Sequence, residues 1–153
     1  MSLISVTVRV FDTRSRKKRE LVTLEEGKVG LYACGITPYS SSHIGHARQA
    51  ISFDIIVRWL RKRGFEVNYI TNFTDVDDKI IAAANEEGVD FLEISNRYID
   101  DYFQSMDALN VIRADSYPRV TETIPEIIEM VESLIEKGNA YLAEDGVYFE
   151  IDT

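Results

Sequence analysis

Two histidines flank a glycine where an apolar run gives way to a long helical pattern. They lie in the tetrapeptide His43-Ile44-Gly45-His46, and the chain contains 2 histidines in all. A helix N-terminus presents unpaired N–H groups and a partial positive charge, which suit a phosphate. Imidazole donors could follow the charge on a transferring phosphoryl group, and Gly45 would let a base approach closely. From spacing alone, surface histidines or a pair of metal ligands remain alternatives.

The single cysteine is the second candidate for chemistry. Cys34 ends an apolar run at residues 29–34, immediately before Gly35. A cysteine in an apolar strand is usually a small core residue. The carboxyl end of a strand is, however, where α/β sheets bind ligands. One cysteine cannot form an internal disulfide, and nothing in the sequence indicates an oxidising compartment.

The pattern around these residues predicts an α/β fold with a parallel sheet. Strand patterns cover residues 5–11, 29–34 and 67–73, and a helical pattern covers residues 46–63. The run at 29–34 is almost entirely apolar, which is typical of a strand buried on both faces. Strand, helix and strand in this order predict a βαβ unit.

The ends and the buried face of the long helix can also be predicted. Serines at 40–42 can cap its N-terminus, and Gly64 suits the left-handed residue after its last turn. An apolar residue recurs at every fourth position, and this stripe is expected to face the core. The stripe consists of Ala47, Ile51, Ile55 and Trp59, with Ile56 and Leu60 beside them.

Three further helices and a hairpin are predicted after residue 73. Thr74 is expected to cap the first of these helices, which ends before Gly88. Carboxylates in its first turn are interpreted as partners of the helix dipole rather than metal ligands; they are Asp75, Asp77 and Asp78. The second helix is indicated by a capping pair at Asp90 and Glu93 and by an apolar stripe, which consists of Leu92, Ile99, Phe103, Met106 and Leu109. The third helix is expected from Thr123 to Gly138. A turn at Asp145-Gly146 indicates the hairpin.

Composition limits the class of protein. The 153 residues are enough for one domain with a core, and the hydrophobic (45%) and charged (28%) fractions are those of a soluble globular protein. No apolar run approaches the roughly 18 residues that span a bilayer, and no signal peptide is evident, so we expect a cytoplasmic protein. The net charge of −9 argues against a domain that holds a polynucleotide by itself. Basic clusters at 14–19 and 58–63 are interpreted as a solvated turn and a helix end.

Three linked motifs resemble the cysteinyl-tRNA synthetase family in order, spacing and setting. They lie at residues 32–39, 43–48 and 72–81, and residues 107–115, 118–119 and 135–141 are also similar to that family. The likeness runs from about residue 10 onward. It implies a Rossmann-like class I synthetase nucleotide-binding half-domain at 1–115 and the start of an inserted connective segment at 116–153.

The resemblance also implies a reaction and its residues. His43, Ile44, Gly45 and His46 would bind ATP, supplied with Mg²⁺, and the two histidines would stabilise the α-phosphate under attack by the cysteine carboxylate. In the family the cysteine at Cys34 binds Zn²⁺, which the substrate thiolate also coordinates. Gly35, Thr37 and Thr74 fall where the family contacts the amino acid. The implied partners of the full-length enzyme are ATP, L-cysteine and tRNA(Cys).

The sequence departs from the family in several places. Ser40 stands where relatives usually have Asp, and the chain has neither a second cysteine nor a third histidine for the remaining zinc ligands. It also lacks the Lys-Met-Ser-Lys-Ser loop. We therefore expect a fragment that by itself neither activates cysteine efficiently nor charges tRNA. A cysteine ligase of the mycothiol pathway, a non-catalytic nucleotide-binding half-domain and a generic nucleotidyltransferase are the alternatives.

Overall fold

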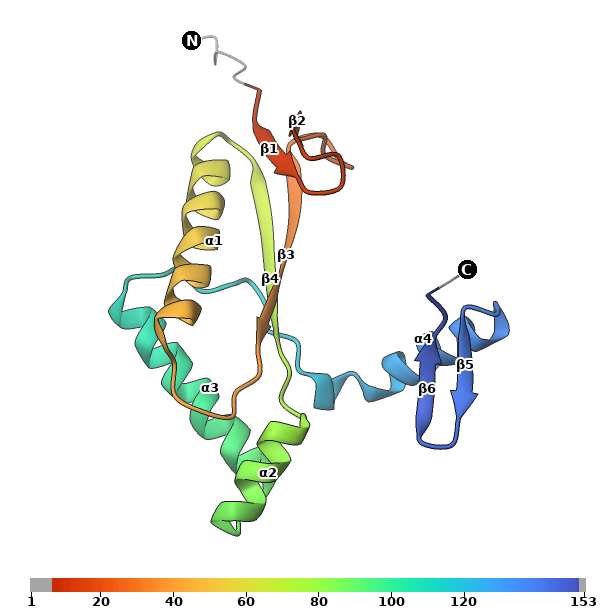
Figure 1. Cartoon of the computed structure of the whole chain (residues 1–153). Helices are drawn as coiled ribbons and strands as arrows, with labels where there is room; N and C mark the ends of the chain where they lie inside the picture. The colour runs from red at the N-terminus through yellow and green to blue at the C-terminus, as the bar shows by residue number, and fades with distance from the viewer. Residues whose placement is uncertain (1–6, 152–153) are drawn as a thin grey trace.

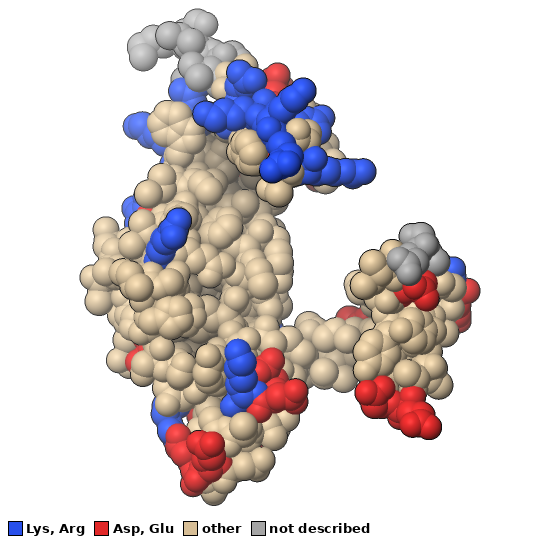
Figure 2. Space-filling view, in the orientation of Figure 1, with Lys and Arg blue, Asp and Glu red and all other residues tan. Residues whose placement is uncertain are grey.

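A computed structural model describes residues 7–151, and the chain begins there with a basic hairpin. Strand β1 (Arg9–Asp12) pairs antiparallel with β2 (Lys17–Glu20), and residues 5 and 6 of the expected first strand lie outside the described residues. Figure 2 shows Lys and Arg side chains gathered over this hairpin. The expected turn at 14–19 is therefore wrong for Lys17–Arg19, which are in a strand. The chain reverses earlier because the Asp12 carboxylate accepts the backbone N–H groups of Arg14 and Ser15.

The centre of the fold is the predicted βαβ unit. Strands β3 (Lys28–Ile36) and β4 (Glu66–Phe73) pair in parallel, and helix α1 (Ile44–Lys62) connects them. In Figure 1 the helix lies along one side of the strand pair. The core between helix and strands is apolar and consists of Val29, Ala33, Val57, Leu60, Val67 and Tyr69.

Strand β3 is buried on one face, so the prediction of burial on both faces is wrong. Val29, Ala33 and Ile36 face the core, whereas Tyr32 is 61% exposed and Cys34 is also exposed. An almost uninterrupted apolar run does not show whether both faces are covered, because coverage depends on which elements pack there. In the part of the chain that Figure 1 draws in colour, α1 and α3 lie on the same side of the strand pair.

Helix α1 ends as predicted but buries only part of the predicted stripe. Gly64 follows its last turn with φ +91°, in the left-handed region. Ala47 and Leu60 are buried as predicted, but the predicted stripe is wrong for its other members. These are Ile51, Ile55, Ile56 and Trp59, which are 38%, 61%, 41% and 53% exposed. Side chains four residues apart turn progressively around a helix with 3.6 residues per turn, so such a row leaves the sheet. The buried residues are Ala47, Ala50, Val57 and Leu60.

The next two helices begin at aspartates. Asp77, not Thr74, caps α2 (Asp78–Glu87) by accepting the N–H of Lys79. The helix ends before Gly88 as predicted, and this glycine lies in the left-handed region. Asp90 caps α3 (Phe91–Ala108) as expected. Its predicted partner Glu93 bonds to Arg97 instead. Along α3, Ile99 and Met106 are buried and Phe103 is half-buried, whereas Leu92 and Leu109 are exposed.

Asp75 is not part of a helix. It is fully buried and accepts hydrogen bonds from Thr121, from the backbone N at 3.0 Å and from the hydroxyl at 2.5 Å. The interpretation of Asp75 as a partner of the helix dipole is therefore wrong. The carboxylate instead joins the end of β4 to a segment 46 residues further along the chain.

The remaining chain first follows β4 and then moves away from it. Ser116 and Arg119 form parallel bridges to Ile70 and Phe73, so the segment after the proposed boundary at 115/116 still lies along the sheet. That boundary stays a prediction. After it come the 3₁₀ helix η1 (Val120–Glu122) and helix α4 (Ile124–Glu136). The predicted hairpin follows and consists of β5 (Ala140–Ala143) and β6 (Gly146–Phe149). Figure 1 shows α4 and this hairpin standing apart from the βαβ unit. Between residues 7 and 151, no helix combines the length and apolarity needed to cross a membrane.

Candidate functional site

The predicted site residues meet at the carboxyl end of the β3–β4 pair. Cys34 and Gly35 lie near the end of β3, His43 precedes the first turn of α1, and Thr74 follows β4. Two contacts connect these segments. The Gln49 side chain of α1 donates to the Cys34 carbonyl at 2.6 Å, and the Thr74 backbone N donates to the Ile36 carbonyl at 3.0 Å. The structure therefore brings the ends of both strands and the start of the helix together.

His43 caps α1 in place of the predicted serines. Its Nδ1 accepts the N–H of Gly45 at 3.0 Å, and Nδ1 of His46 accepts the N–H of His43 at 3.4 Å. The two rings are stacked, with centroids 3.9 Å apart and planes at 19°. Because a nitrogen that accepts a hydrogen bond carries no proton, each neutral ring carries its proton on Nε2. Both histidines can therefore donate a hydrogen bond from Nε2.

The surroundings of the helix start favour a neutral His46 and a bound anion. Burial lowers the pKa of His46, and the neighbouring His43 lowers it further. The first turn of α1 contains no acidic residue that would offset the positive end of its dipole. A Cβ on Gly45 would lie 2.8 Å from Cε1 of His43, so glycine allows the His43 ring to fold over the helix end.

A β-bulge at Cys34 and Gly35 interrupts the pairing of β3 with β4. Ala33 pairs with Thr71 and Ile36 pairs with Phe73, so Cys34 and Gly35 together oppose Asn72. A Cβ on Gly35 would lie 1.5 Å from the Asn72 carbonyl oxygen, which excludes any other residue without a backbone shift. Gly35 is thus required by packing, whether or not it contacts a ligand.

Asn72 is a site residue that the sequence analysis did not single out. Its Oδ1 accepts the Gly35 N–H and the Tyr32 hydroxyl, both at 2.8 Å, and its Nδ2 lies 3.4 Å from Oγ1 of Thr74. Thr74 is half-buried beside it, and Thr37 is half-buried just beyond β3. The available signal was an asparagine two residues before Thr74, near the carboxyl end of a predicted strand.

Comparison with known proteins decides the family. Residues 20–153 match the family described as tRNA synthetases class I (C) catalytic domain. The chain belongs to this family. The fold agrees with this assignment. The chain superposes on the methionyl-tRNA synthetase of Mycobacterium tuberculosis in complex with methionyl-adenylate with a TM-score of 0.67 and 25% sequence identity. The superposition covers 74% of this chain and 23% of that synthetase.

Cysteine–tRNA ligases are similar to this class I synthetase domain over nearly its whole length. The ligase of Maridesulfovibrio salexigens is 51% identical over 145 residues, which cover 94% of this chain and 30% of the ligase. That of Thermodesulfovibrio yellowstonii is 49% identical over 149 residues, 95% of this chain and 31% of the ligase. The chain thus spans about a third of the length of these relatives.

The described part of this synthetase domain does not fit a complete metal site. Residues 7–151 contain no group of three or more His, Cys, Asp or Glu side chains placed to hold a metal ion. A structural or catalytic zinc needs at least three protein ligands. The exposed thiol of Cys34 could supply one of them.

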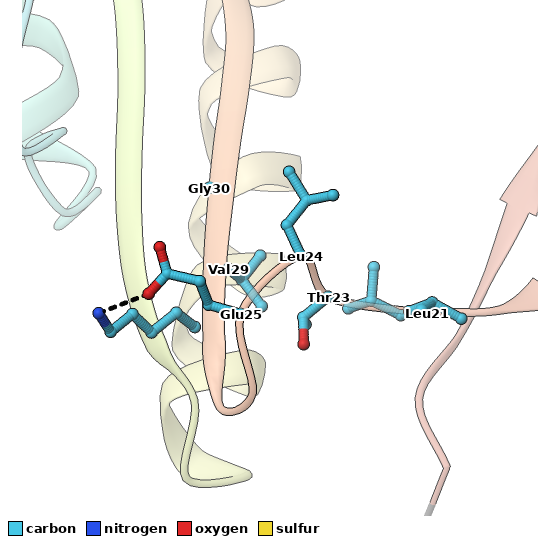
Figure 3. A pocket seen from close by; sticks show the side chains of 8 residues that line it. Leu21, Thr23, Leu24, Glu25, Val29 and Gly30 are labelled. Atoms are coloured by element: carbon cyan, nitrogen blue, oxygen red, sulfur yellow. Dashed lines mark hydrogen bonds and ion pairs between the residues drawn. The ribbon is translucent and has the colours of Figure 1, made fainter.

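The pocket in Figure 3 lies at the opposite end of the sheet from the histidines. Leu21, Thr23, Leu24 and Val29 line it, and the ion pair of Lys28 with Glu25, at 2.7 Å, lies beside them. These residues surround the amino end of β3, whereas ligands of α/β sheets bind at the carboxyl ends. We therefore locate the candidate site at the start of α1 and not in this pocket.

Proposed function

We propose that this chain is the ATP-binding part of a cysteine–tRNA ligase, which activates cysteine as cysteinyl-adenylate and transfers it to tRNA(Cys). The observation that carries the proposal is the start of α1. There two stacked histidines with Nε2 donors, at a first helical turn without acidic residues, lie next to the bulge at Cys34 and Gly35. The similarity to cysteine–tRNA ligases over 94–95% of the chain supports the choice of amino acid.

The first step is an in-line displacement at phosphorus. A carboxylate oxygen of cysteine attacks the α-phosphorus of ATP, the bond to the bridging oxygen breaks, and pyrophosphate leaves with the electron pair. Negative charge accumulates on the phosphate oxygens, where Nε2–H of His43 and His46 would donate hydrogen bonds. Because the donors are already oriented by the helix cap, little reorganisation accompanies the reaction. Ile44 and Gly45 would bind ATP through the same turn.

The amino acid would bind beside the bulge. Gly35, Thr37 and Thr74 are the proposed cysteine contacts, and they lie at the carboxyl edge of the sheet. We also propose Cys34 as one ligand of a zinc ion, whose preference for thiolate over hydroxyl would separate cysteine from serine. The described residues contain no group of three or more His, Cys, Asp or Glu side chains that would complete such a site. Mg²⁺ would accompany ATP. The proposal includes a cytoplasmic location, which the single cysteine favours.

A hybrid enzyme tests this function. The matching 145 residues of the Maridesulfovibrio salexigens ligase are replaced by this chain, and cysteine-dependent ATP–pyrophosphate exchange and charging of tRNA(Cys) are measured. We expect an active hybrid, a loss of about 10²- to 10³-fold with His46→Ala, and no exchange by the 153-residue chain alone. Ser52→Ala, an exposed position on α1, is the control. A folded hybrid without exchange would contradict the proposal and favour a non-catalytic nucleotide-binding domain.

A further inference from the structure

The side chain of Asn72 joins the ends of β3 and β4 on the exposed face of the sheet. Its Oδ1 accepts two hydrogen bonds from β3, one from the Gly35 N–H and one from the Tyr32 hydroxyl, each at 2.8 Å. Its Nδ2 faces Oγ1 of Thr74, 3.4 Å away, just after β4. One amide group therefore contacts the residue next to Cys34 on one strand and Thr74 on the other.

The β-bulge explains why a side chain is needed here. Two residues oppose one at this point, so the ladder is interrupted and the Gly35 N–H points to the Asn72 side chain rather than to a backbone carbonyl. A half-buried N–H without a partner costs free energy comparable to a lost hydrogen bond. The Asn72 amide satisfies this N–H and stabilises the bulged conformation of Cys34 and Gly35.

The same contacts determine the orientation of the amide and of the Thr74 hydroxyl. The Gly35 N–H can only donate, so the atom that it contacts must be the amide oxygen, and Nδ2 must face Thr74. Oγ1 of Thr74 then acts as an acceptor towards Asn72. Its own hydroxyl hydrogen is left to donate to another acceptor, such as a carboxylate or carbonyl oxygen.

We infer that Asn72 is a positioning residue for the amino-acid side of the site. This inference rests on the proposed function. Asn72 holds the bulge at Cys34 and Gly35 in place and turns the donor of Thr74 away from the sheet. Neither contact involves the start of α1, so Asn72 acts on amino-acid binding and not on ATP binding.

Two substitutions separate these contacts. Asn72→Ala removes the hydrogen bonds from Gly35 and Tyr32 and the contact with Thr74. Asn72→Asp keeps an oxygen acceptor for Gly35 and Tyr32 but places a second oxygen opposite Thr74, which then donates its hydrogen to the carboxylate. Asn68→Ala is the matched control, because Asn68 is exposed and lies four residues earlier on the same face of β4.

The first measurement is amide hydrogen exchange of Gly35 in the 153-residue chain, followed by NMR. We expect exchange about tenfold faster in Asn72→Ala, because one hydrogen bond is lost. Asn72→Asp and Asn68→Ala should keep the original rate. An unchanged Gly35 rate in Asn72→Ala would overturn the inference whether or not the chain belongs to an active enzyme.

The second measurement compares KM values in the hybrid enzyme. Asn72→Ala and Asn72→Asp should each raise KM for cysteine about tenfold, the effect of one hydrogen bond, with KM for ATP unchanged. Equal increases in the KM values for cysteine and for ATP would indicate a merely structural role. If Asn72→Asp has the same KM for cysteine as the unsubstituted hybrid, Asn72 does not act by orienting the Thr74 hydroxyl. An inactive unsubstituted hybrid contradicts the proposed function instead, so the two failures are distinguishable.

Discussion

The rings of His43 and His46 stack 3.9 Å apart and together cap helix α1. Nδ1 of each ring accepts a backbone N–H, that of Gly45 and that of His43 respectively. The two residues proposed to bind phosphate therefore also hold their own helix end. Protonating Nδ1 of His46 would remove an acceptor from the cap, so the fold and the site respond to acid through the same atom.

Stability should fall in mild acid because of His46. Burial and the nearby His43 lower the pKa of His46 in the folded chain. In the unfolded chain the pKa of His46 is about 6.5, so the unfolded chain binds the proton more readily than the folded one. The contribution of His46 to the free energy of unfolding is therefore present above that pH and is lost as the pH falls through the lower pKa of the folded chain. Thermal unfolding followed by circular dichroism between pH 5 and 8 (roughly the range in which histidine titrates) measures this.

The variant His46→Gln serves as the control for this pH effect. Glutamine keeps a side-chain acceptor near the His43 N–H but does not titrate. The difference in Tm between the original chain and the variant should shrink as the pH falls. A difference that stays constant would mean that protonation of His46 has no influence on stability.

Gly35→Ala should destabilise the fold strongly. The new Cβ would lie 1.5 Å from the Asn72 carbonyl oxygen, so the two strands would have to separate at the bulge. We expect a loss of about 2–3 kcal/mol, typical of overpacking, in urea unfolding. Gly30→Ala on the same strand is the control, because a Cβ there has nothing within 4 Å. Equal effects of the two substitutions would show that the contact is relieved at little cost.

Asp75→Ala should separate the end of β4 from the segment at Thr121. The substitution leaves the Thr121 N–H without its carboxylate partner, which should cost about 1–3 kcal/mol. Asp78→Ala, an exposed carboxylate in the first turn of α2, should cost about 0.5 kcal/mol or less. Chemical denaturation of both variants gives the comparison. Similar losses would contradict a special role of the buried carboxylate.

The buried and the exposed apolar residues of α1 should differ sharply in their contribution to stability. Leu60 is 4% exposed, and Leu60→Ala should cost about 2–4 kcal/mol through the cavity that it leaves. Ile55 is 61% exposed, and Ile55→Ala should stay within about 0.5 kcal/mol. Equilibrium unfolding of the 153-residue chain tests both. A large effect of Ile55→Ala would restore the stripe predicted from the sequence.

Local sequence alone determined most of the elements from β3 onward and several of their ends. The βαβ unit, the left-handed residue Gly64, the end of α2 at Gly88 and the C-terminal hairpin were predicted and are confirmed, although the hairpin turns at Glu144 and Asp145, one residue earlier than predicted. These features depend on periodicity and on the conformations open to glycine, which are properties of neighbouring residues. The motif His43–His46 was likewise evident at the start of its helix.

Only the tertiary structure decided which side chains are buried and how the site is connected. The buried face of α1, the carboxylate of Asp75 on Thr121 and the contact of Asn72 with Gly35 depend on residues brought together from distant parts of the chain. A periodic pattern does not specify which stripe of a helix meets the sheet, and a bulge follows from the pairing of two strands. Such contacts arise from packing, so they are not encoded in any single segment.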